Sequence, residues 1–159
     1  DSGAPWYDVY ECADGTWISV GAIEAKFYAN LLAGLGLDPA DLPDQHDEAA
    51  WPALRERFAE VFRRRSRAAW LEVFADDDNC VSPVLPFTEV LDDEHLAARG
   101  TYVDLDGVPQ PAPAPRFDRT PAELHRPPPV VGQHTAELLA EAGFTPEHAA
   151  ALRAGGAVA

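Results

Sequence analysis

The chain opens with two short β-prone runs, and a helical spacing of apolar residues follows them. Residues 7–12 and 16–21 are rich in β-branched and aromatic side chains and flank an Asp-Gly turn, which predicts a β-hairpin. From residue 23 the apolar positions recur every three or four residues, which predicts a helix over residues 23–32. Gly34 and Gly36 follow, and either glycine is suited to end that helix.

Two further helices and an extended segment are predicted next. A helix over residues 47–62 has one apolar face, and Ser66 is placed to cap a third helix. Residues 80–86 are apolar but contain two prolines, so they are predicted to be extended without forming a central antiparallel strand. Short helices are expected after Thr88 and over residues 94–99.

A second hairpin and a proline-rich segment complete the pattern before the last helices. Residues 102–105 lead into an Asp-Gly turn, which is again a hairpin signal. Proline stands at every second position over residues 109–115 and fills residues 127–129, which favours extended, polyproline-like chain. Two final helices are expected, one over residues 135–142 and one that Thr145 caps.

The order of these elements indicates an α+β fold. A hairpin, helices, an extended segment, a second hairpin, a tether and final helices do not form the regular strand–helix alternation of a doubly wound sheet. We expect a small α+β domain over residues 1–108, a proline-rich extended tether over residues 109–131, and a C-terminal helical tail over residues 132–159.

Charge and composition exclude several classes of function. The 159 residues carry a formal net charge of −15, which argues against nucleic acid because such binding relies on Lys and Arg that neutralise phosphates. No apolar run is long enough to span a bilayer, so no membrane partner is expected. Cys12 and Cys80 form neither a disulfide framework nor a metal cluster, which favours reduced thiols and a cytoplasmic location. The absence of methionine, even at position 1, indicates a fragment of a longer protein.

The sequence contains no self-contained catalytic motif. It lacks GxSxG, a P-loop, GxGxxG and HExxH. The five histidines are dispersed, and although His134 and Glu137 share a helix face, two ligands do not complete a zinc site. We therefore expect no metal and no resident cofactor. Cys80 stands beside Val81 and Pro83 and is expected to be a buried, inert thiol.

Glu24 is a carboxylate at the junction between the second β-prone run and the first helix. It stands between Ile23 and Ala25, and an ionised carboxylate without a partner is costly to bury in apolar surroundings. Two interpretations stay open on the residues alone. Glu24 is either a first-turn helix glutamate that the helix dipole favours, or a side chain with a role in a functional site.

Several ordered motifs resemble one protein family. Asp-Val-Tyr-Glu-Cys-Ala-Asp-Gly (8–15) and Ile-Ser-Val-Gly-Ala-Ile-Glu (18–24) are similar to the small domain of α-methylacyl-CoA racemases, which belong to the family III CoA-transferase (CaiB/BaiF) superfamily. Gly-Gln-His-Thr-Ala-Glu-Leu-Leu (132–139) resembles the C-terminal signature of that family. Further matching segments are residues 27–28, 35–37, Trp70, 73–74, 80–84 and 113–117.

The resemblance implies that the chain is the C-terminal part of a larger enzyme. In this family a large N-terminal domain supplies most of the CoA site, together with the His and Asp that act as acid and base. The tail over residues 132–159 is then expected to pack on that large domain. Family members form interlocked homodimers in which the small domain of one subunit closes the active site of the other. This chain alone is therefore expected to be inactive.

The resemblance also implies roles for Glu24 and Ile23. The matching glutamate of racemase-like members lies beside the catalytic His, so Glu24 is expected to orient that imidazole and to favour its charged form. A carboxylate in this position stabilises imidazolium and fixes its tautomer, which suits proton transfer at the α-carbon of a 2-methylacyl-CoA thioester. Ile23 is expected to face the acyl chain. CoA is part of the substrate, and no cofactor is implied.

Two other functions stay open. Family III CoA transferases move CoA between carboxylic acids by means of a carboxylate nucleophile from the large domain, and they often lack a glutamate at the position of Glu24, which favours a racemase. Alternatively, the chain is a non-catalytic structural or dimerisation module whose apolar helix faces contact partners. Exposed apolar surface would then make the isolated chain aggregate.

Overall fold

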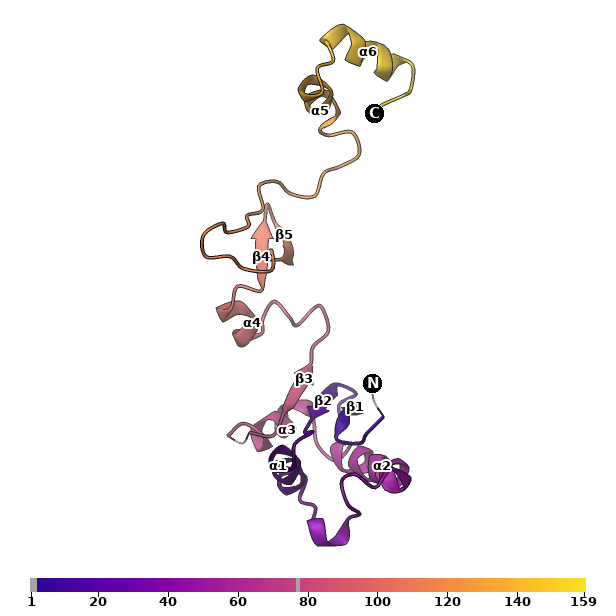
Figure 1. Ribbon diagram of the computed structural model, residues 1–159, viewed down its shortest axis with the longest axis vertical. Coiled ribbons are helices and arrows are strands. Elements are labelled where there is room, and N and C mark those ends of the chain that lie inside the picture. The colour runs from indigo at the N-terminus through magenta and orange to yellow at the C-terminus, as the bar shows by residue number, and fades with distance from the viewer. Residues whose placement is uncertain (1–2, 77) are drawn as a thin grey trace. The chain divides into compact units, whose positions relative to one another are not determined.

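The computed structural model describes residues 3–76 and 78–159, which belong to two compact units of an α+β protein (Figure 1). The first unit ends at Glu89 and the second begins at Val90. The fold class expected from the sequence is confirmed, because small antiparallel sheets and short helices make up both units. The functional domain boundaries expected after residues 108 and 131 stay predictions.

A three-stranded antiparallel sheet forms one layer of the first unit. The predicted hairpin consists of β1 (Tyr7–Glu11) and β2 (Trp17–Gly21). β3 (Val81–Val84) pairs with the other side of β2, so the strand order is β1-β2-β3. The proline-containing segment is thus an edge strand, where Pro83 is tolerated because no further strand requires its missing N–H.

Helices cover one face of this sheet and bury the core. They are α1 (Ala25–Leu35), α2 (Trp51–Phe62) and α3 (Arg67–Val73), and Figure 1 shows α1 and α2 on the same side of the sheet. Alternate residues of the strands point to the helices, as a half-buried sheet requires. The larger side chains of the core are Tyr10, Ile18, Val20, Tyr28, Leu31, Leu32, Leu54, Phe58, Val61, Phe62, Trp70 and Phe74.

The helix ends follow the sequence signals closely. Of the two glycines that were candidates for the end of α1, Gly36 has the left-handed conformation (φ 69°), whereas Gly34 lies inside the helix. The hydroxyl of Ser66 accepts the N–H of Ala69 and caps α3. Asp47 caps a short 3₁₀ turn from which α2 continues, so the predicted helix over residues 47–62 is confirmed with a tighter first turn.

The second unit contains a short helix, a two-stranded hairpin and two further helices. The elements are α4 (Glu94–Ala98), β4 (Tyr102–Leu105), β5 (Val108–Pro111), α5 (Thr135–Glu141) and α6 (Pro146–Ala154). All of them match predicted elements, but the proline-rich segment begins with a strand: its first residues pair with β4 as part of β5. Both strands of a two-stranded ribbon are edges, which is the setting in which strand prolines are tolerated.

The helix predicted after Thr88 is wrong. Residues 87–92 form consecutive turns, the first of which is closed by the N–H of Glu89 and the carbonyl of Pro86. This bond spans three residues, whereas an α-helical bond spans four, so the segment turns without closing an α-helical turn at its start. The side chain of Glu89 also binds Arg67, a long-range contact without a local sequence signal.

Within the described residues, no helix has both the length and the apolar character needed to cross a membrane.

Candidate functional site

Glu24 lies where β2 passes into α1, and its side chain is exposed. It is the N-cap residue of α1 (φ −75°, ψ 145°), yet its carboxylate accepts no hydrogen bond from the helix. By contrast, the hydroxyls of Ser66 and Thr145 each accept an N–H from the first turn of their own helices. Among the described residues, no hydrogen bond or ion pair engages the Glu24 carboxylate. Glu24 thus precedes the first turn rather than lying in it, and it does not cap the helix.

The backbone on both sides of Glu24 is fixed by hydrogen bonds. The N–H of Gly21 donates to the carbonyl of Cys80, and the next N–H along the chain donates to the carbonyl of Trp6, both at 2.9 Å. The carbonyl of Glu24 accepts the N–H of Tyr28, also at 2.9 Å, and so starts the helix. A carboxylate with no partner among residues 3–76 and 78–159 therefore lies on a turn whose backbone is fixed.

Gln45 makes the side-chain contact to this turn, and sequence reasoning missed it. Its side-chain N–H group donates to the carbonyls of Ile23 at 2.8 Å and Ala22 at 3.4 Å. Its own main-chain carbonyl accepts the indole N–H of Trp6 at 3.1 Å and that of Trp51 at 3.0 Å. Gln45 is buried, although it stands in a loop of polar residues, and such a setting in the sequence gives no signal of burial.

Lys26 and Asp78 place further charge near the start of α1. The Lys26 ammonium lies 3.1 Å from the Asp78 carboxylate, and both side chains are well exposed. The side-chain amide of Asn30 donates to the main-chain carbonyl of Asp78 at 2.9 Å, which holds this loop against the helix. An exposed ion pair of this kind adds little stability. Lys26 pairs with Asp78, and no ion pair joins it to Glu24 in the part of the chain that the structure describes.

Cys80 is exposed, so the prediction of a buried thiol is wrong at this position, and Cys12 is the buried cysteine. Cys80 has a left-handed backbone (φ 55°) immediately before β3, a conformation uncommon for residues other than glycine. Desolvation and the nearby Asp78 and Glu24 carboxylates raise the pKa of the Cys80 thiol. The thiol is therefore protonated at neutral pH, and it is a poor nucleophile in that form.

Ile23 is next to Glu24 and is 47% exposed, which leaves an apolar side chain available beside the carboxylate. A shallow depression of about 320 Å³ begins at the same turn, since Gly21 and Cys80 line one end of it and Tyr7, Val9 and Ser19 extend it across the exposed face of the sheet. The arrangement offers a carboxylate with an apolar neighbour on an open surface. These residues do not by themselves form a closed acid–base pair.

The histidines do not complete such a pair within the described residues. The ring of His46 packs edge-on against Trp6 at 6.0 Å, and His134 lies 3.4 Å from a carboxylate oxygen of Glu137 in the second unit. No hydrogen bond or ion pair joins a histidine to Glu24 in the part of the chain that the structure describes. The same residues contain no cluster of three or more side chains suited to hold a metal ion.

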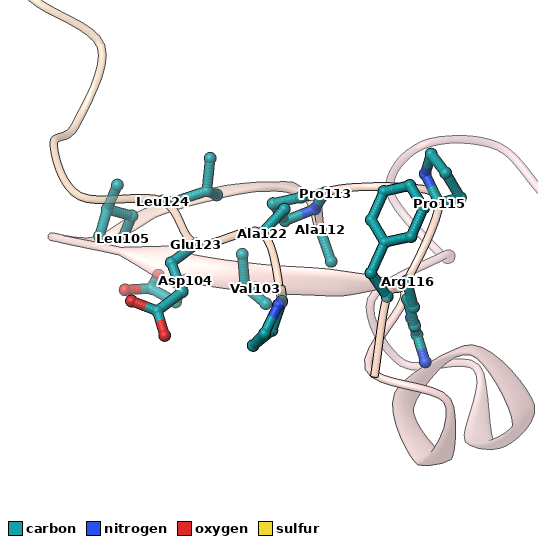
Figure 2. A pocket seen from close by; sticks show the side chains of 12 residues that line it. Val103, Asp104, Leu105, Ala112, Pro113, Pro115, Arg116, Ala122, Glu123 and Leu124 are labelled. Carbon is teal, nitrogen blue, oxygen red and sulfur yellow. The ribbon is translucent and has the colours of Figure 1, made fainter. Parts of the chain in front are cut away.

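A larger groove, of about 560 Å³, lies in the second unit between the β4–β5 hairpin and the proline-rich segment that follows it (Figure 2). Apolar side chains and prolines form most of its lining. Figure 2 shows the carboxylates of Asp104 and Glu123 at one end and Arg116 at the other. We take the turn at Glu24 as the stronger candidate site because it presents a carboxylate that no described residue pairs, on a backbone that hydrogen bonds hold in place.

Comparisons with known proteins show which family the chain belongs to. The family model described as CoA-transferase family III matches residues 1–135. The chain is 46% identical to the alpha-methylacyl-CoA racemase of Mus musculus and 42% identical to that of Homo sapiens, each over 149 residues. These matches cover 92% of this chain and 39% of each racemase. The chain thus spans about two fifths of the length of the curated relatives it matches.

Other similar proteins include a transferase and two solved structures. The formyl-CoA:oxalate CoA-transferase of Rhodopseudomonas palustris is 30% identical over 129 residues, which cover 71% of this chain and 29% of that protein. A CaiB/BaiF family protein from Brucella suis has a TM-score of 0.67 at 22% identity and covers 89% of this chain and 38% of its own. The Rv3272 protein of Mycobacterium tuberculosis has a TM-score of 0.66 at 17% identity, and the match covers 86% of this chain and 40% of the Rv3272 chain. The chain belongs to CoA-transferase family III.

Proposed function

We propose that this chain is the small-domain and C-terminal portion of an acyl-CoA racemase, which epimerises the α-carbon of 2-methylacyl-CoA thioesters. The observation that carries the proposal is the presentation of Glu24: an exposed carboxylate, without a partner among the described residues, on a backbone that hydrogen bonds hold in place. The 46% identity to a mouse alpha-methylacyl-CoA racemase supports the choice of reaction.

The chemistry requires a proton to leave one face of the α-carbon and a proton to return to the other face. A base breaks the Cα–H bond, and the electron pair moves into the thioester carbonyl to give an enolate. An acid on the opposite face then protonates the α-carbon, so that the configuration changes without other bond changes. Both groups need pKa values near neutrality, and histidine meets this requirement best.

Glu24 supports the histidine in this scheme. The imidazole and the second acid–base group, an aspartate, belong to the large N-terminal domain of the complete enzyme. When that imidazole approaches Glu24, the carboxylate accepts its N–H, fixes the tautomer and stabilises the imidazolium that forms during proton transfer. Ile23, which is half exposed beside Glu24, contacts the acyl chain of the substrate.

The proposal also includes the partners of the chain. The large domain and a second subunit cover the surface around Glu24, and the assembly is an interlocked homodimer. The exposed apolar side chains on the open face of the sheet, Tyr7, Val9, Trp17 and Val84, support a covering partner because water solvates them poorly in isolation.

A CoA transferase is the second candidate, and the similarity to the formyl-CoA:oxalate CoA-transferase of Rhodopseudomonas palustris favours it. In that reaction the acyl-CoA α-carbon is not involved, and a carboxylate of the large domain attacks the thioester carbonyl. The Glu24 turn would then have no chemical role, so the two candidates differ in whether an α-proton is exchanged.

The deciding experiment incubates the complete enzyme with 2-methyldecanoyl-CoA in D2O and follows the α-proton by NMR. A racemase replaces that proton with deuterium at a rate well above the buffer rate. A parallel reaction with free oxalate as acceptor detects CoA transfer by mass spectrometry. Transfer without exchange would overturn the racemase proposal. This chain by itself is expected to show neither reaction, and exchange by the isolated chain would overturn the assignment of the acid and base to the large domain.

A further inference from the structure

We propose that Gln45 is a positioning residue for Glu24; this inference rests on the racemase function proposed above. Gln45 does not contact reacting atoms in this scheme. It acts on the peptide that carries Glu24, and through that peptide it sets where the carboxylate meets the imidazole.

The contact between Gln45 and the peptide bond preceding Glu24 is direct. The carbonyl of Ile23 belongs to the peptide unit that links Ile23 to Glu24, and the Gln45 amide donates to this oxygen at 2.8 Å. A second, longer bond of 3.4 Å reaches the carbonyl of Ala22. Because a peptide unit is planar, a bond to its oxygen fixes the whole unit, including the amide nitrogen of Glu24.

Neither the sheet nor the helix satisfies these two carbonyls. The ladder of β2 ends at Gly21, and the helical hydrogen bonds of α1 begin with the carbonyl of Glu24. Residues 22 and 23 lie between the two elements. The bond to the Ala22 carbonyl is buried and the bond to the Ile23 carbonyl is partly buried, so water has little access to the first and limited access to the second. A buried carbonyl without a donor is costly, and the peptide would turn to find one.

Gln45 is itself held rigidly, which a positioning group requires. Its main-chain carbonyl accepts the indole N–H groups of Trp6 and Trp51 at 3.1 and 3.0 Å. These two rings pack edge to face with centroids 5.9 Å apart. Trp6 also accepts the N–H of Ala22 through its carbonyl, so the same residue holds both Gln45 and the turn. Supporting groups of this kind keep a functional side chain within the narrow range of productive geometry.

The test uses the complete enzyme and the Gln45→Met variant, which keeps the length of the side chain and removes both N–H donors. With 2-methyldecanoyl-CoA in D2O, we expect kcat for α-proton exchange to fall by about tenfold to a hundredfold while KM changes little, as for a misplaced reactive group. The variant is then combined with Glu24→Gln. If Gln45 acts through Glu24, the double variant is no slower than Glu24→Gln alone.

A matched control separates positioning from general loss of stability. Trp70→Phe removes another buried donor to a backbone carbonyl in the same unit, the bond to Phe62 at 2.7 Å. It is expected to lower the melting temperature and to leave kcat unchanged. If Gln45→Met fails to fold, Gln45→Asn replaces it, because asparagine keeps the amide on a shorter side chain. The double variant of Gln45→Asn and Glu24→Gln is again expected to be no slower than Glu24→Gln alone.

The outcomes also separate this inference from the proposed function. An unchanged kcat for the Gln45 variant overturns the positioning role, and so does a loss that adds in full to that of Glu24→Gln. If Glu24→Gln itself leaves exchange unaffected, the site role of Glu24 fails first. If Glu24→Gln lowers kcat for exchange and the Gln45 variant does not, the positioning role is refuted and the site role of Glu24 stands.

Discussion

Phe74 packs directly on the backbone of α1 at Gly34. A Cβ atom built on Gly34 would lie 2.1 Å from Cε1 of the Phe74 ring, which is far inside van der Waals contact. Phe74 is buried at the end of α3 and stacks on Trp70 with ring centroids 5.9 Å apart. Gly34 therefore serves close packing between two segments distant in sequence, rather than an unusual backbone conformation.

The Gly34→Ala substitution is expected to destabilise the first unit. Helix propensity alone would favour alanine by about 1 kcal/mol, but a methyl group forced into a filled core costs about 1–3 kcal/mol. We expect a net loss in the free energy of unfolding, measured by urea denaturation. Ala29→Gly, at an exposed position of the same helix, isolates the propensity contribution. A more stable Gly34→Ala protein would show that Phe74 moves away easily.

Glu24→Gln in the complete enzyme is expected to slow α-proton exchange by roughly a hundredfold or more, the range typical of groups that assist proton transfer. The melting temperature should stay within about 1 °C, because the carboxylate is exposed and makes no hydrogen bond or ion pair among the described residues. Glu56→Gln removes an exposed carboxylate on α2 and is the matched control, with no effect expected on either quantity. Turnover equal to that of the unaltered enzyme would refute the site role of Glu24.

Tyr10 is expected to make the first unit sensitive to alkali. Its hydroxyl donates to the carbonyl of Pro5, and burial, with a contribution from Asp8, raises the pKa of Tyr10 well above its usual value of 10.0. The unfolded chain then loses this proton at a lower pH than the folded chain. The stability that Tyr10 contributes is complete below pH 10 and is lost as the pH rises beyond it.

The Tyr10→Phe variant tests this dependence. It is expected to be less stable at neutral pH by about 1 kcal/mol, because the hydrogen bond to Pro5 is lost and its carbonyl stays buried. Between about pH 9 and about pH 11 its stability should fall less steeply than that of the unaltered chain. Urea denaturation across this range measures both effects. If the free energy of unfolding falls with pH at the same slope in the variant and in the unaltered chain, Tyr10 has the same pKa in the folded and unfolded states.

Local signals in the sequence predicted most of the fold. The Asp-Gly turn before β2 and the cap at Ser66 depend on residues only a few positions apart, so they are visible without tertiary structure. The role of Gly34 inside α1 was not. It depends on Phe74, which is forty positions further along the chain and fills the space at Gly34.

The candidate site was only partly predictable for the same reason. Glu24 stands out because a carboxylate follows a β-prone run, and the structure places it on an exposed, well-held turn. Gln45 is hidden among polar loop residues, and only the fold brings its amide to the Ile23 carbonyl. The exposure of Cys80 was missed because apolar neighbours suggested burial, whereas the fold places this residue beside Tyr7 and Ser19 along the open depression.

In the second unit, Arg126 ties the proline-rich segment to α5 through Glu137. The two terminal nitrogens of Arg126 donate to the two carboxylate oxygens of Glu137 at 3.1 and 2.6 Å, a bidentate pair. The hydrogen bond from Arg126 lowers the pKa of Glu137 below its usual 4.5, and His134 adds to the effect. The contact is therefore complete above pH 4.5 and is lost as the pH falls through the lowered value.

Acidification is expected to release this contact locally, without unfolding the chain, because exposed ion pairs contribute little to global stability. NMR chemical shifts of the Arg126 side chain and of the α5 amides, followed from about pH 7 to about pH 3, should report a transition below the usual range of glutamate. Glu137→Gln should remove this transition and give the low-pH shifts already at neutral pH. Glu141→Gln removes a nearby carboxylate that forms no hydrogen bond with Arg126 and should leave the transition in place. If α5 titrates identically in the Glu137 variant, another group controls its docking.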